Sequence, residues 1–210
     1  MPFTPAQFFE VFRSYNEFVW PAPLLLSLLA VVAATVAFTG RQLAVKLTLL
    51  LLFVWCAVMY HWLHFTPVNP AAWLFGALFV AGGFLFLRDV HFGEAAGARV
   101  VAGLLFIGYA LVAYPLIAFA LGHRYPWLPT FGAPCPLTIY AIGLLLTARA
   151  PLPVAPAIVP LIWAAIGSSA AVSLGVREDL GLTAAGLTLL AVLIQDRLPS
   201  TRGEKLLSQT

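Results

Sequence analysis

Charged residues are scarce in this chain: they make up 9% of its 210 residues, against roughly 25% in an ordinary soluble domain. Hydrophobic residues make up 62%, and the mean hydropathy is +0.97. Since a membrane span needs about 20 apolar residues, the chain has room for several spans and none for a separate soluble domain. The composition therefore excludes one large water-soluble core and predicts an all-α, polytopic transmembrane helix bundle.

Cysteine is also scarce. Cys56 falls in the middle of one apolar run and Cys135 at the edge of another. Their different depths argue against a disulfide between them, and two cysteines say little about the redox compartment.

Seven apolar segments of the sequence are bounded by charges, which predicts about seven spans. The fifth and the seventh have only about 15 residues, which flanking residues and local bilayer thinning can accommodate. The lead-in to the fifth, "PTFGAPCP", is expected to enter membrane depth where other helices shield it. The segments are Pro21–Thr39, Leu43–Leu63, Pro70–Leu87, Arg99–Leu121, Pro136–Ala148, Pro153–Gly175 and Leu180–Ile194.

Several chemical signatures are missing from the sequence. It has no G-x-S-x-G elbow, no P-loop and no dinucleotide fingerprint. The seventh segment has no lysine, which excludes a retinal Schiff base. Every Asp, Glu, Lys and Arg lies near a segment end, whereas proton- and voltage-driven machines usually place one at mid-bilayer. These absences favour a binding protein over an enzyme.

The N-terminus is not expected to be a signal peptide, because it lacks a basic region and carries Glu10 and Glu17. Thr4-Pro5 is typical of a helix start. Residues 1–20 are predicted to form an amphipathic helix on the membrane surface, and the alternative is a helix packed against the spans. Aromatic and aliphatic residues recur there at helical spacing: Phe8, Phe9, Phe12, Tyr15 and Val19.

The basic residues predict the orientation. With seven spans, the N-terminal side holds three of them and the other side holds eight, so the N-terminus is expected outside and the 198–210 tail in the cytoplasm. Residues 21–197 then form the seven-span bundle in the inner membrane. Because the positive charge is explained as an orientation signal, a nucleic-acid partner is not expected. The eight are Arg41, Lys46, Arg88, Arg99, Arg149, Arg197, Arg202 and Lys205; the three are Arg13, Arg124 and Arg177.

The stretch "GHRYPWLPTFGAPCPLT", residues 122–138, is a dense polar and proline-rich knot between two apolar segments, on the predicted outer side. Other polar residues share that side by topology. They are His61 and His64 at the end of the second segment, Asn69 just beyond, and Glu178 and Asp179 between the sixth and the seventh.

These residues suggest a metal site as one interpretation. His61-x-x-His64 would place two imidazoles on one helix face, and a helix start favours the thiolate of Cys135. With His123 and a carboxylate from Glu178 or Asp179 they form a ligand set for zinc or copper. A bis-histidine haem is a less favoured cofactor. The alternatives are a purely interfacial role for these rings and a site for an organic ligand.

Arg124 is predicted to hold Glu178 or Asp179 through its forked guanidinium, or else to face an anionic ligand. Tyr125 and Asn69 are further candidate anchors of the site.

Three strings, "YHWLHFTPVNPAAWLFG", "LGHRYPWLPTFGAPCPLTIYAIGLLL" and "GSSAAVSLGVREDLGL", resemble an uncharacterised bacterial family of small multi-pass membrane proteins. The resemblance covers nearly the whole chain. It implies a prokaryotic integral membrane protein and supplies no activity.

The sequence thus predicts an inner-membrane protein that binds or transports a small solute or metal ion. One alternative is a membrane enzyme or haem-type electron carrier using the same residues. Another is an accessory subunit of a homo- or hetero-oligomer, with the small-residue stripe "IGSSAAVSLG" as its interface.

Overall fold

The computed structural model describes residues 3–198, and the regular structure in this range is entirely helical. The predicted all-α class is confirmed. The α-helices are α1 (Pro5–Val19), α2 (Ala22–Val36), α3 (Gln42–Trp55), α4 (Ala72–Leu85), α5 (Ala98–Gly108), α6 (Tyr114–Ala120), α7 (Pro134–Leu146), α8 (Ile158–Leu174) and α9 (Leu180–Gln195). Short 3₁₀ segments are η1 (Ala37–Thr39), η4 (Ala155–Ala157) and η5 (Arg177–Asp179), and π-helical segments are η2 (Cys56–Phe65) and η3 (Tyr109–Ala113).

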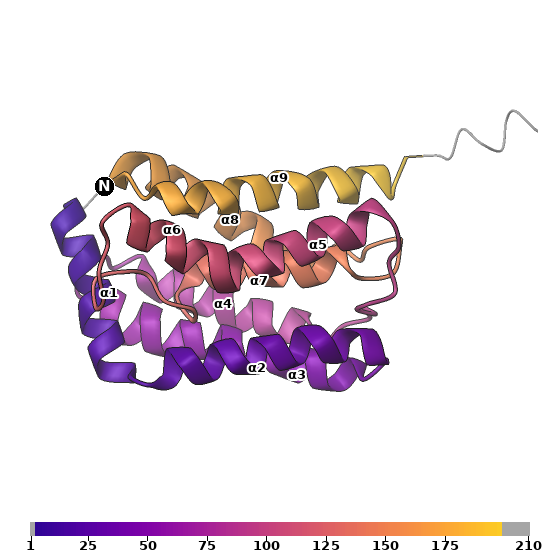
Figure 1. Cartoon of the computed structure of the whole chain (residues 1–210), viewed down its shortest axis with the longest axis horizontal. Helices are drawn as coiled ribbons and strands as arrows, with labels where there is room; N and C mark the ends of the chain where they lie inside the picture. The colour runs from indigo at the N-terminus through magenta and orange to yellow at the C-terminus, as the bar shows by residue number, and fades with distance from the viewer. Residues whose placement is uncertain (1–2, 199–210) are drawn as a thin grey trace, which may run out of the picture.

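The helices join into seven apolar segments that run back and forth along one direction (Figure 1). Five of these are long and apolar enough to cross a membrane, and α4 and α7 are shorter, with 14 and 13 residues. The prediction that the seventh segment is short was wrong, because η5 extends α9 into a stretch of 19 residues. The fifth segment is short as predicted, and the third is short as well. The polar tail predicted for 198–210 lies outside the described residues, apart from Leu198.

Helix α7 is the centre of the bundle. All its residues except Cys135 are buried, and it packs against α5, η3, α8 and α9. Its backbone comes close to that of α5, since a Cβ added to Gly143 would lie 2.8 Å from the carbonyl oxygen of Gly103. Helix α7 is therefore enclosed by other helices along its length.

The side chains on the outside of the bundle are mostly large and apolar. Examples are Leu28 on α2, Leu105 on α5 and Val172 on α8, which is 81% exposed. Hydroxyls on this surface bond to their own helix: Thr35 donates to the Val32 carbonyl, and Thr188 to the Ala184 carbonyl. A surface with apolar side chains and satisfied backbone groups is compatible with a bilayer.

Helix α1 crosses one end of the bundle, which we call the α1 end (Figure 1). It begins with a capping box in which Thr4 and Gln7 bond to each other's backbone. Its apolar face packs on η2 and α2, as in the packed alternative predicted for this helix. The face turned away carries Arg13 between Glu10 and Glu17, and this arginine holds the pKa of Glu10 below its usual value.

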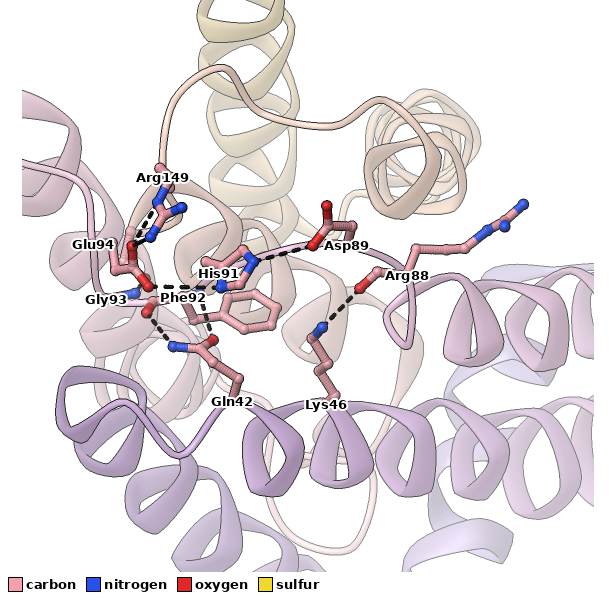
Figure 2. A network of polar contacts seen from close by, with 10 residues as sticks. Gln42, Lys46, Arg88, Asp89, His91, Phe92, Gly93, Glu94 and Arg149 are labelled. Atoms are coloured by element: carbon pink, nitrogen blue, oxygen red, sulfur yellow. Dashed lines mark hydrogen bonds and ion pairs between the residues drawn. The ribbon is translucent and has the colours of Figure 1, made fainter.

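The opposite end is closed by the loop between α4 and α5 (Figure 2). Gln42 and Phe92 exchange two hydrogen bonds, of 2.7 and 3.0 Å, and Lys46 donates to the Arg88 carbonyl. Glu94 pairs with Arg149, which links the loop to the segment after α7. Another ion pair at this end, Arg99–Asp196, joins α5 to the end of α9.

Candidate functional site

A cavity of about 150 Å³ lies at the α1 end. Its wall is largely aromatic and comes from α1, η2, α4, α6 and α8, and the 129–136 lead-in to α7 closes one side. The expectation that this lead-in is shielded by other helices agrees with its burial. The aromatic lining consists of Phe3, Phe8, Phe12, Tyr60, Phe65, Phe75, Tyr114 and Trp163.

Asp179 supplies a carboxyl group to the cavity wall and is 3% exposed. Its Oδ1 accepts a hydrogen bond of 2.6 Å from the Tyr114 hydroxyl, and the Cys135 thiol also faces this carboxyl group. Burying a carboxyl group costs free energy unless polar partners compensate. The Tyr114 and Cys135 side chains provide part of that compensation.

Glu178 lies next to Asp179 in η5 and is completely buried. Its Oε1 lies 2.9 Å from Nδ1 of His123, and its backbone carbonyl accepts a hydrogen bond from Tyr109. Its Oε2 has no hydrogen-bond partner among residues 3–198. The knot predicted at residues 122–138 is thus joined to the start of α9 through His123.

Asn16 on α1 holds the loop between α6 and α7. Its amide nitrogen donates to the carbonyls of Pro126 and Leu128, at 2.6 and 2.8 Å, and its side-chain oxygen accepts from Thr130. Tyr125 adds a bond to the Asn16 carbonyl, so it acts as a structural anchor. Asn16 was not among the predicted site residues, although an amide on the apolar face of an amphipathic helix indicates such a contact.

His61 and His64 point in different directions, so the prediction that both lie on one face was wrong. His61 is completely buried among aromatic rings, including Phe79 and Trp163, and neither ring nitrogen has a partner in the described part of the chain. His64 instead bonds to the Met59 carbonyl and packs on Phe18. The reason is that η2 is π-helical, so each residue turns the helix less than in an α-helix and positions three apart separate.

The structure therefore divides the six predicted metal ligands. It pairs His123 with Glu178 and Cys135 with Asp179, and it leaves His61 and His64 elsewhere. Within residues 3–198, no group of three or more His, Cys, Asp or Glu side chains is arranged to hold a metal ion.

The predicted pairing of Arg124 with Glu178 or Asp179 was wrong. Arg124 is exposed, donates to the Phe119 carbonyl at the end of α6, and lies 3.8 Å from the centre of the Phe119 ring. A cation at a helix C-terminus is favoured by the helix dipole, which explains this local choice. His123, its neighbour, takes the carboxylate instead. Asn69 caps the turn before α4 by accepting from Ala71, and it also lines the cavity.

The fold and the site define a class of protein: an all-helical bundle with several helices long and apolar enough to cross a membrane, and a small aromatic cavity near one end. Residues 5–203 match the model of a family of unknown function, DUF6064, and the chain belongs to this family. No curated protein and no solved structure matches the chain.

Proposed function

We propose that the chain is an integral protein of the bacterial inner membrane that binds a small solute in the cavity at its α1 end. In this proposal seven segments cross the bilayer, the α1 end faces outside and the C-terminus lies in the cytoplasm. The apolar exterior and the concentration of basic residues at the opposite end support the orientation.

The observation that carries the proposal is the cavity itself. Residues of α1, η2, α4, α6 and α8 line this cavity. Asn16 on α1 holds the 122–133 loop through hydrogen bonds to the carbonyls of Pro126 and Leu128. A cavity of about 150 Å³ has the size of one known to hold benzene. The expected ligand is therefore a compact molecule of that size, bound mainly by aromatic surface and oriented by a few polar groups.

Binding is favoured over passage through the bundle. The central helix α7 starts at the cavity and is buried along its length, and it packs closely on α5 at Gly103 and Gly143. A solute leaving the cavity toward the opposite end would have to separate these packed helices.

Native mass spectrometry of the full-length protein, released from membranes in detergent, tests the proposal. The cavity-filling variant Ala170→Leu should lose a small-molecule adduct that the wild type carries. The matched control Ala165→Leu, on the exposed side of α8, should retain it. Equal spectra for all three proteins would contradict solute binding in this cavity.

A further inference from the structure

The wall of the cavity carries one carboxyl group and no basic side chain among the described residues. Asp179 faces the Tyr114 hydroxyl and the Cys135 thiol, which are both neutral donors. The neighbouring acid, Glu178, is directed to His123, so that histidine is not available to Asp179.

Because both side-chain partners of Asp179 are uncharged, a buried carboxylate here is best compensated by a cation that also donates hydrogen bonds. The rest of the wall suits such a ligand, since aromatic side chains attract cations through the negative faces of their rings. Tyr60 and Trp163 lie in this wall. The same aromatic surface accommodates short alkyl groups.

Building on the proposed solute-binding function, we propose that the cavity recognises a small alkylammonium group, with Asp179 as the counter-ion. The size of the cavity restricts the group to a compact one. Such a group occurs on free amines and on the head groups of aminophospholipids, and the two sources share this chemistry.

The test uses the full-length protein in dodecyl maltoside micelles, which carry neither charge nor ammonium. Isothermal titration calorimetry compares tert-butylammonium chloride with tert-butyl alcohol, a neutral molecule of nearly the same shape. The wild type should bind the ammonium about tenfold more tightly or better, as expected for a hydrogen bond to a charged group. The variant Asp179→Asn, which keeps an acceptor for Tyr114, should lose that preference.

Equal affinity for both probes, or a preference that Asp179→Asn leaves unchanged, would overturn the alkylammonium assignment. If both probes bind equally and Ala170→Leu abolishes both, the solute-binding function stands and only the charge assignment fails. Binding of neither probe overturns the assignment, and the native mass spectra then decide on the function separately. The wild-type comparison needs no variant, so it remains decisive even if Asp179→Asn does not fold.

Added phosphatidylethanolamine distinguishes the two sources. If the head group is the ligand, this lipid should weaken the binding of tert-butylammonium to the wild type by competition. If a free amine is the ligand, the affinity should stay unchanged.

Discussion

His123 and Glu178 are 55 positions apart in the chain, and a hydrogen bond of 2.9 Å joins Nδ1 of the one to Oε1 of the other. The bond connects the loop after α6 to the turn before α9, and the Glu178 side chain is completely buried. Replacing His123 by Ala leaves that carboxyl group without its partner. We expect His123→Ala to lower the free energy of unfolding by about 1–3 kcal/mol, measured by denaturant unfolding in detergent.

A double-mutant cycle with Glu178→Gln isolates this pair. The two substitutions should be less than additive, because both remove the same contact. Strict additivity would show that the two side chains do not interact in solution.

Asn16 makes three side-chain hydrogen bonds to the 126–130 stretch, and it is fully buried. Asn16→Ala should destabilise the protein by about 2–3 kcal/mol, at roughly 1 kcal/mol for each bond. Asn16→Asp should be no better, because it replaces the amide donor with an oxygen facing two carbonyl oxygens. Thermal unfolding in detergent measures both.

The control for Asn16 is Ser14→Ala, at an exposed position on the same helix. It should leave the unfolding temperature almost unchanged. If Asn16→Ala were equally harmless, the attachment of the loop to α1 would not depend on this amide.

Gly93, at the end opposite α1, has φ of +74°, and a Cβ there would overlap the carbonyl oxygen of Ala37. Gly40 has a similar φ of +77°, but a Cβ there meets nothing within 4 Å. Gly40→Ala should therefore cost only the left-handed conformation, about 1–2 kcal/mol. Gly93→Ala should cost clearly more, since the loop must also move. Equal unfolding temperatures for the two variants would contradict this close approach.

The helical segments were predictable because apolar runs and charges mark them directly in the sequence. That His123, Cys135, Glu178 and Asp179 lie at the same end was also within reach, since topology alone puts them there, although they form two separate pairs. The direction of His61 was not, because the π-helical turn of η2 depends on packing and has no signature in the sequence. The partner of Arg124 was missed for a different reason. Arg124 donates to the Phe119 carbonyl at the end of α6, five residues earlier in the chain, and the Glu178 carboxyl group is already bonded to His123.

The orientation can be tested by fusions to alkaline phosphatase, which is active only outside the cytoplasm. Among the described residues, six basic side chains belong to the end opposite α1, whereas Arg13, Arg124 and Arg177 belong to the α1 end. Because positive charge is retained in the cytoplasm, phosphatase fused after Leu128 should be active. Fusions after Ala95 and after Thr210 should be inactive, and a reporter that works only in the cytoplasm should work at both sites. The fusions also test the number of crossings. Four predicted spans, an even number, lie between Ala95 and Thr210, so both sites should be on the same side. Activity at Thr210 with inactivity at Ala95 would mean that an odd number of segments crosses between them. Of the two short helices, only α7 lies between Ala95 and Thr210, so its crossing would then be in question.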